Sequence, residues 1–167
     1  FPGRRNSSGL ALSDRSEAGQ LLAAMRWALG ASEHTAHPIV NGIELVRPVR
    51  PVLDPSDRRR RVGETGEATG EDVRAALDAA AGSQAEWDRR GGGARAEILE
   101  RAADRFEESR AYLMALLVRE AGRTVANALS EVREAVDFLR YYAKEARLRF
   151  AAPMALPGPA GERNMMS

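Results

Sequence analysis

Glu134 is the residue whose type and surroundings most suggest chemistry, because its carboxylate lies among aromatic side chains within EVREAVDFLRYYAKEA, residues 131–146. At 100° per residue, Asn127, Phe138 and Tyr141 fall on the same side of a predicted helix as Glu134. Spacing leaves two roles open for Glu134: an exposed surface glutamate, or a carboxylate that faces a ligand or a partner. The opposite side of the helix carries the aliphatic stripe expected to pack on a core, which consists of Val125, Leu129, Val132, Val136, Leu139 and Ala143.

The other charged residues of this helix have a simpler interpretation. Arg133 precedes Asp137 by four residues, and Asp137 precedes Arg140 by three. Such spacing is typical of surface ion pairs that stabilise a helix by a few tenths of a kcal/mol, roughly 0.2–0.5 per pair. We therefore predict two ordinary surface pairs here.

Several further motifs favour structural roles over functional ones. GETGEATGED (63–72) lacks the Gly-Lys-Ser/Thr ending of a phosphate-binding loop. The triple glycine at 91–93 does not fit a dinucleotide fingerprint, so it is predicted to be a loop. The basic run at 58–61 has no interleaved aromatic residues and indicates a solvated or salt-bridged hairpin edge. His34 and His37 lack the carboxylates of a metal shell, so a surface loop is expected and no metal site is predicted.

The composition excludes several classes of protein. The chain has 167 residues, of which 44% are apolar and 29% charged, as in a globular domain with its own core. Its formal net charge of +1 gives no reason to expect nucleic acid as a partner. The absence of cysteine removes any thiol nucleophile from these residues. The apolar runs are too short to span a membrane, and there is no signal-peptide pattern, so a cytoplasmic location is expected.

The order of patterns predicts four regions. Residues 1–37 form a Gly- and Ser-rich leader followed by a helix, and 38–68 form a β-hairpin region. Residues 69–150 are expected to be almost entirely helical. The Pro- and Gly-rich residues 151–167 cannot continue the helix and are expected to connect to a missing downstream part. We expect an internal piece of a longer polypeptide.

Turn and capping residues place the boundaries within these regions. Asn41-Gly42 between apolar residues predicts a type I′ hairpin, because both central residues of that turn need positive φ. Pro48 and Pro51 restrict their strand to a sheet edge or to an irregular stretch. Thr69 is a suitable N-cap, and Gly122 a suitable C-cap, for the predicted helices.

Residues 38–150 resemble the N-terminal part of the aldehyde dehydrogenase superfamily. The resemblance rests on an Asn-Gly hairpin followed by EATGEDVRAALDAA, and above all on RAEILERAADRFEE, REAGRT and EAVDFLRYYA. It implies an α/β fold in the full enzyme. The present chain would be mostly α-helical with a short irregular β-hairpin.

Within that superfamily the chain looks most like the 1-pyrroline-5-carboxylate (glutamate semialdehyde) dehydrogenases, particularly those fused to a proline dehydrogenase half in bifunctional bacterial enzymes. Two features carry this narrower resemblance: the leader RRNSSGLALSD followed by a helix, and the glutamate within EAVDFLRYYA. In these enzymes the helix glutamate is associated with recognition of the α-amino group of the substrate. The resemblance thus implies that Glu134 binds substrate.

The resemblance also implies the chemistry of the whole enzyme. A cysteine thiolate attacks the aldehyde, hydride passes to NAD, and a glutamate-activated water hydrolyses the thioester. All of these catalytic and cofactor-binding residues would lie downstream of this chain, which is expected to be inactive alone. FAD would belong to an upstream proline dehydrogenase half in a bifunctional enzyme. The expected partners are the small-molecule substrate, the remainder of the polypeptide and, at full length, further copies in a homo-oligomer.

Two alternatives remain open from the sequence. The chain could belong to an aldehyde dehydrogenase with a different aldehyde substrate, in which Glu134 would be a solvated surface residue. It could instead be a non-catalytic helical interaction module whose aromatic residues bind a partner.

Overall fold

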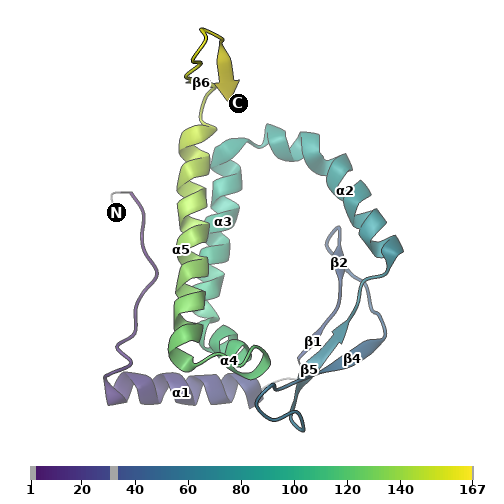
Figure 1. Ribbon diagram of the computed structural model, residues 1–167, viewed down its shortest axis with the longest axis vertical. Coiled ribbons are helices and arrows are strands. Elements are labelled where there is room, and N and C mark those ends of the chain that lie inside the picture. The colour runs from purple at the N-terminus through teal and green to yellow at the C-terminus, as the bar shows by residue number, and fades with distance from the viewer. Residues whose placement is uncertain (1–2, 31–33, 167) are drawn as a thin grey trace. The chain divides into compact units, whose positions relative to one another are not determined.

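The computed structural model describes residues 3–30 and 34–166, so the ends of the predicted leader and connector (residues 1–2 and 167) and residues 31–33 lie outside the described part. As predicted, the chain is mostly α-helical with a few short strands (Figure 1). The described helices are α1 (Arg15–Gly30), α2 (Gly70–Arg89), α3 (Gly91–Glu108), α4 (Arg110–Glu120) and α5 (Val125–Arg149). The described strands are β1 (Thr35–Ala36), β2 (Ile39–Val40), β3 (Ile43–Glu44), β4 (Val49–Leu53), β5 (Arg61–Gly66), β6 (Met154–Leu156) and β7 (Asn164–Met166).

The chain divides into two compact units. The first consists of Phe1–Gly9, Glu86–Ser109 and Glu131–Ser167, and so contains α3, most of α5 and the last two strands. The second consists of Leu10–Ala85 and Arg110–Ser130, and contains α1, α4 and the other strands.

In the first unit, α3 and α5 lie side by side through very small residues (Figure 1). Ala96 and Ala103 of α3 and Ala143 of α5 are completely buried. A Cβ on Gly92 would collide with the carbonyl oxygen of Ala146, so this position requires glycine. The triple glycine was predicted to be a loop, but that prediction is wrong because these residues begin α3. The lack of a side chain at Gly92 permits the close approach of the two helices.

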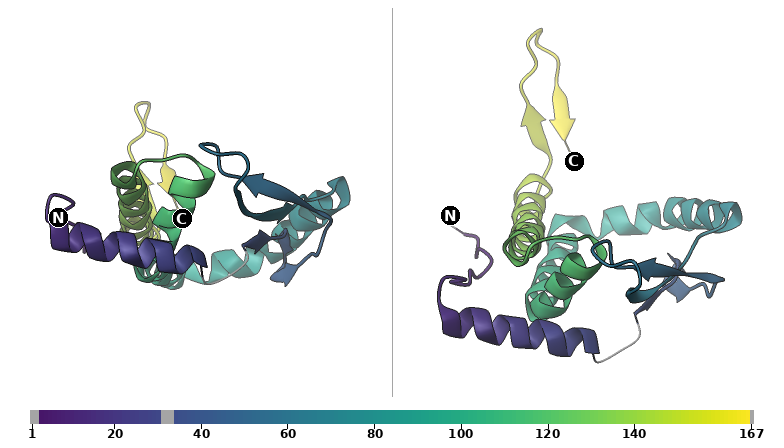
Figure 2. Two further views of the ribbon diagram at one scale, coloured as in Figure 1. Left: turned by 90° about the horizontal axis from the view of Figure 1, so that it is seen from below. Right: turned by 60° about the horizontal axis from the view of Figure 1, so that its bottom comes forward.

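The aliphatic stripe of α5 forms the packed side of this helix, as the periodicity predicts. Val132, Val136 and Ala143 are buried in the first unit, and Leu129 is buried in the second. Helix α5 ends at Arg149, before Pro153, the first proline of the segment predicted as a connector. The segment predicted as a connector forms an antiparallel hairpin of β6 and β7 that extends beyond the end of α5 (Figure 2).

The second unit contains a three-stranded sheet in the order β1-β5-β4. Strand β4 lies at the edge of the sheet and contains Pro51, as predicted for this proline, whereas Pro48 lies just before the strand. Its register shifts between Val52 and Leu53, which is the predicted irregularity. Strand β1 pairs in parallel with β5 at the other side, an interaction between distant residues that no local pattern indicated.

The turn signals of the second unit are confirmed. Asn41 and Gly42 have φ of 50° and 77° and join β2 to β3 in an antiparallel hairpin. Gly122 has φ of 65° just after α4, and the following N–H of Arg123 donates to the carbonyl of Leu117 at 3.2 Å. Helix α1 packs against α4, burying Leu21 and Met25.

Candidate functional site

Glu134 lies on the exposed side of α5, away from the buried stripe. Within the described residues its carboxylate has neither a hydrogen-bond nor an ion-pair partner. Of the charged residues near it along the helix, Arg133 and Asp137 are engaged with the N-terminal segment. Glu134 is therefore an accessible carboxylate on a long helix that forms no ion pair with any of the described residues.

Aromatic rings continue the exposed side of the helix beyond Glu134. Phe138, one turn later, is 50% exposed, and its ring stacks on Tyr142 with centroids 6.1 Å apart. Tyr141 packs edge-on against Tyr142, with the guanidinium of Arg4 over its ring 5.9 Å from the centroid. A carboxylate beside exposed aromatic rings is suited to a ligand that carries both a cationic group and an apolar chain.

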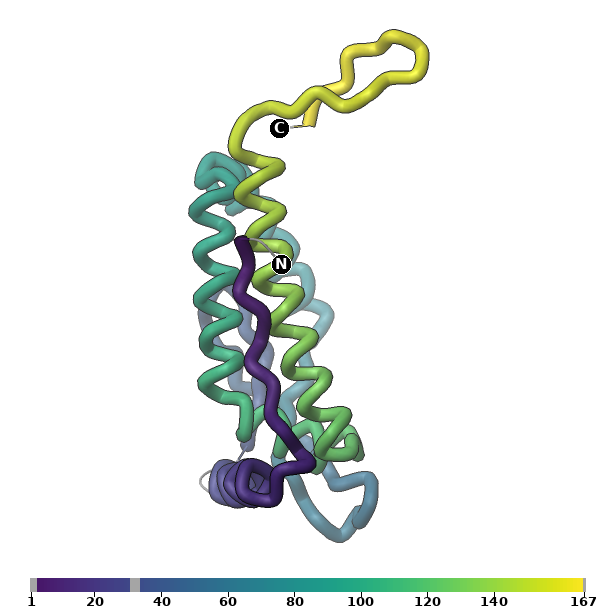
Figure 3. Tube along the Cα trace, turned by 90° about the vertical axis from the view of Figure 1, so that its left-hand side faces the viewer, coloured from purple at the N-terminus to yellow at the C-terminus, as the bar shows by residue number. Residues whose placement is uncertain are grey.

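The N-terminal residues reach the same part of α5. Figure 3 shows this segment running along α3 and α5. The backbone N–H of Ser7 donates to Oδ1 of Asp137 at 2.7 Å, and its hydroxyl is 3.1 Å from Oδ2. Arg4 donates to the backbone carbonyl of Asp137 at 3.2 Å, and Arg133 donates to the Ser7 hydroxyl at 3.4 Å. We name residues 4–8 the N-terminal arm.

The predicted surface pairs of Asp137 with Arg133 and Arg140 are wrong. Asp137 accepts from Ser7 of the arm, and Arg140 is only 7% exposed. The Nη2 of Arg140 contacts Asp104 at 2.9 Å and Glu107 at 2.8 Å. Helical spacing identified possible neighbours on one helix, but α3 and the arm supply partners that spacing cannot indicate.

Glu107 is the most perturbed carboxyl in this cluster. Hydrogen bonding from Arg140, helped by the backbone N–H of Ser8, lowers the pKa of Glu107 to about 2. Arg5 of the arm adds an ion pair to Asp104 at 2.7 Å. A cleft of about 380 Å³ opens beside these groups, but most of its lining charges are already paired, so it is better explained as the junction between arm and helices.

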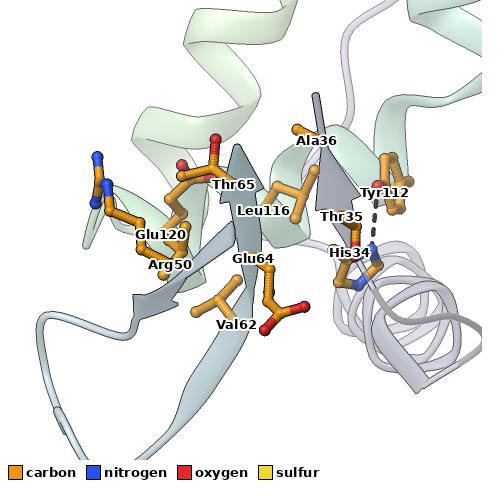
Figure 4. A pocket seen from close by; sticks show the side chains of 12 residues that line it. His34, Thr35, Ala36, Arg50, Val62, Glu64, Thr65, Tyr112, Leu116 and Glu120 are labelled. Carbon is orange, nitrogen blue, oxygen red and sulfur yellow. Dashed lines mark hydrogen bonds between the residues drawn. The ribbon is translucent and has the colours of Figure 1, made fainter. Parts of the chain in front are cut away.

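The second unit contains a separate cleft of about 420 Å³ between its sheet and α4 (Figure 4). Glu64 and Glu120 supply carboxylates, and Arg50 lines the wall near Glu120. The hydroxyl of Tyr112 and Nδ1 of His34 are 3.2 Å apart. The sequence did not predict this cleft, although Glu120 lies in REAGRT, one of the phrases that carry the family resemblance.

Both histidines lie in loops, as predicted, on either side of β1, but neither is fully exposed. His34 is half-buried and bonded to Tyr112. His37 is also half-buried, and its Nδ1 accepts from the backbone N–H of Arg47 at 3.4 Å. Within residues 3–30 and 34–166, no three His, Asp or Glu side chains are grouped so that they could hold a metal ion.

The N-terminus of α2 follows the glycine-rich segment and could in principle receive a phosphate. Thr69 caps this helix: its hydroxyl accepts from the N–H of Asp72 at 3.2 Å, and its own N–H donates to the Asp72 carboxylate at 2.9 Å. Hydrogen bonding from Arg47 and Thr69 holds the pKa of Asp72 well below its usual range. A buried carboxylate thus already accepts a backbone N–H at the start of α2, and its negative charge disfavours a phosphate there, so the segment does not fit a nucleotide.

The basic run at 58–61 is salt-bridged, as predicted. Arg59 and Arg60 contact Asp57 at 2.9 and 3.2 Å, and Arg61 contacts Glu64 at 2.8 Å. Among the described residues, none of the helices combines the length and apolar character that crossing a membrane requires.

Comparison with known proteins gives a consistent result. Residues 46–166 match the profile of the Aldehyde dehydrogenase family. The bifunctional protein PutA of Escherichia coli strain K12 is 38% identical over 149 residues, which is 89% of this chain and 11% of that protein.

Two solved structures resemble the chain closely. Proline utilization A (PutA) from Bdellovibrio bacteriovorus, inactivated by N-propargylglycine, has a TM-score of 0.83 and 27% identity over 95% of this chain and 17% of its own. 1-Pyrroline-5-carboxylate dehydrogenase from Thermus with bound NAD has a TM-score of 0.82 and 27% identity over 95% of this chain and 31% of its own. The chain thus spans less than a third of the length of each of these proteins.

Proposed function

This chain belongs to the aldehyde dehydrogenase family, and we propose that it is part of an NAD-dependent enzyme that oxidises L-glutamate 5-semialdehyde to L-glutamate in proline catabolism. Two similarities support this substrate: the chain resembles both PutA and a 1-pyrroline-5-carboxylate dehydrogenase over nearly its whole length. The open-chain form of that substrate carries an aldehyde at one end and an α-ammonium beside a carboxylate at the other.

The observation that carries the proposal is the carboxylate of Glu134 on the exposed side of α5, which has no partner within the part of the chain that the structure describes. A carboxylate attracts the α-ammonium through a charge-assisted hydrogen bond, which is stronger than one between neutral groups. Its mounting on a long helix restricts where that ammonium can lie. Glu134 would therefore orient the amino acid end of the substrate and leave the aldehyde end for the reacting groups.

Phe138 supports the same assignment because it lies one helical turn beyond Glu134 and leaves half its surface exposed. Its apolar ring can contact the methylene carbons between the two ends of the substrate. A simple aliphatic aldehyde could use that ring but would gain nothing from Glu134. Glu134 and Phe138 together therefore predict selectivity for the amino acid aldehyde over a simple aliphatic aldehyde.

The reacting groups must come from outside this chain. It contains no cysteine, so it cannot supply the thiolate of the proposed reaction. The glycine-rich segment before α2 does not fit a nucleotide, and we propose that other parts of the enzyme bind NAD, the hydride acceptor. In a bifunctional enzyme, FAD would be bound by an upstream proline dehydrogenase half. The segment on its own is expected to be inactive.

The proposal is tested by steady-state kinetics of Glu134→Gln in the full-length enzyme. We expect kcat/KM for glutamate semialdehyde to fall roughly 10- to 100-fold, as expected for loss of one hydrogen bond to a charged group. The kcat/KM for an aliphatic aldehyde without an amino group should stay within about twofold.

Glu108→Gln provides a matched control, because Glu108 is another exposed glutamate of the first unit and makes only a surface ion pair with Arg105 at 3.7 Å. Glu108→Gln should leave kcat/KM unchanged for both aldehydes. Equal losses for the two aldehydes in Glu134→Gln, or no loss for either, would rule out recognition of the α-amino group. That result would favour a family member with a different aldehyde substrate.

A further inference from the structure

The N-terminal arm holds the turn of α5 from which Glu134 projects. Of the charged residues that flank Glu134, Arg133 donates to the Ser7 hydroxyl at 3.4 Å, and Asp137 accepts two hydrogen bonds from Ser7 at 2.7 and 3.1 Å. The bonds therefore reach α5 one residue before Glu134 and three residues after it.

Ser7 is suited to fixing a position because it is buried and fully engaged. Only 6% of its surface is exposed, although the arm on either side is largely exposed. Its N–H and hydroxyl contact different oxygens of Asp137, which restrains the rotation of that carboxylate. Arg4 adds a bond to the backbone carbonyl of Asp137, so side chain and backbone at this turn are both tied to the arm.

We propose that Ser7 is a positioning residue for substrate recognition, acting through Asp137 to hold Glu134 in place. The proposal rests on the role of Glu134 proposed above. Ser7 itself does not touch the substrate. Recognition groups work best when held within about 0.5 Å of their productive position by a supporting shell, and here the arm supplies that shell.

The position of Ser7 explains why loss of its hydroxyl should affect only substrates that need Glu134. The Ser7 bonds engage α5 on the exposed side, whereas α3 packs on the buried stripe with Val136 and Ala143. Loss of the Ser7 hydroxyl leaves the helix packed and shifts only the turn that bears Glu134. A substrate that needs Glu134 should be affected, and one that does not should be unaffected.

The test compares Ser7→Ala and Asp137→Asn in the full-length enzyme with both aldehydes. We expect KM for glutamate semialdehyde to rise roughly 3- to 10-fold with kcat nearly unchanged, since small displacements weaken a charge-assisted bond without removing it. Kinetics with the aliphatic aldehyde should match wild type, which also shows that the variants fold. Ser7→Thr keeps the hydroxyl and should restore most of the lost affinity.

A second measurement separates positioning through Glu134 from any other effect of the arm. When Ser7→Ala is added to Glu134→Gln, KM for the semialdehyde should rise no further, because the group being positioned is already disabled. An additional increase would contradict the proposal. So would a selectivity change that Ser8→Ala reproduces, because the hydroxyl of Ser8 bonds to Glu107 of α3 at 3.2 Å.

The two proposals fail in different ways. If Glu134→Gln leaves the discrimination between aldehydes unchanged, recognition by Glu134 is wrong and the role of Ser7 falls with it. If Glu134→Gln abolishes the discrimination and Ser7→Ala does not alter it, Glu134 binds substrate without help from the arm, and only the positioning role is overturned.

Discussion

Arg140 and Glu107 form a largely buried ion pair between α5 and α3, with Nη2 of the arginine 2.8 Å from Oε2 of the glutamate. The side chains are 7% and 19% exposed, so water screens this pair less than it screens the surface pairs of the same helices. Because Glu107 also accepts from Ser8 of the N-terminal arm at 2.9 Å, one carboxylate joins three segments of the first unit.

This pair predicts a dependence of stability on pH. The pKa of Glu107 falls from 4.5 to about 2 on folding, so its ionised form stabilises the folded state above pH 4.5. That contribution is on the order of 2 kcal/mol, and it should disappear as the pH falls from about 4.5 towards 2. Glu107→Gln should lower the urea midpoint of the enzyme at pH 7 and reduce its acid sensitivity in that range.

Glu108→Gln is the matched control for this pH measurement, because the neighbouring glutamate pairs only at the surface. It should follow the wild-type curve at every pH. A Glu107→Gln enzyme whose midpoint differs from wild type by the same amount at pH 7 and at about pH 2.5 would show that Glu107 does not titrate as described.

The contact between Gly92 and Ala146 predicts a severe effect of one added methyl group. Gly92→Ala would place a Cβ against the Ala146 carbonyl and the Phe150 Cβ, and rigid backbone cannot move aside as a flexible side chain can. We expect overpacking to destabilise the first unit by about 1–3 kcal/mol or more, measurable as a lower apparent Tm.

Gly93→Ala is the matched control for Gly92→Ala, because its Cβ would meet only the flexible end of Arg147 at 3.9 Å. Alanine favours helix by about 0.5–1 kcal/mol over glycine, so this variant should be neutral or slightly more stable. Similar Tm values for the two variants would mean that α3 and α5 do not approach as closely at Gly92.

The N-cap of α2 can be tested locally. Thr69→Ala removes the hydroxyl that accepts from the N–H of Asp72, and we expect a loss of about 1 kcal/mol in the stability of the first helical turn. Native-state hydrogen exchange should show faster exchange of the first-turn amides of α2. Thr69→Ser keeps the hydroxyl and should exchange like wild type; faster exchange in both variants would point away from the capping bond.

Much of the fold could be predicted from the sequence, because its signals are local. Asn41-Gly42, Pro51, Thr69 and Gly122 each act through the backbone geometry of a few residues, and each has the predicted role. The side of α5 that packs followed in the same way from its 3.6-residue period. The division into four regions stays a prediction. The two compact units group residues by contact and not by order along the chain, so they do not test it.

The candidate site followed less completely from the sequence. The exposed side of α5 could be identified by periodicity, and family resemblance then gave Glu134 a proposed role. Its surroundings could not be predicted, because Ser7 and Asp137 are 130 residues apart and their bonds depend on where the N-terminal arm docks. The same reason explains why the cleft beside His34 and Glu120 was missed: its wall includes the parallel pairing of β1 with β5.

Residue types and their spacing along the chain were enough to predict the helices, the turns, the lack of a thiol nucleophile and the family. Which charged side chains are paired, and which remain available to a ligand, followed from the packing of distant segments. Arg140 and Asp137, for which spacing predicted surface pairs, are engaged with α3 and the arm, while Glu134, three residues before Asp137, has no bonding partner among the described residues. Helical periodicity orients a side chain, but the elements that pack against the helix determine its partners.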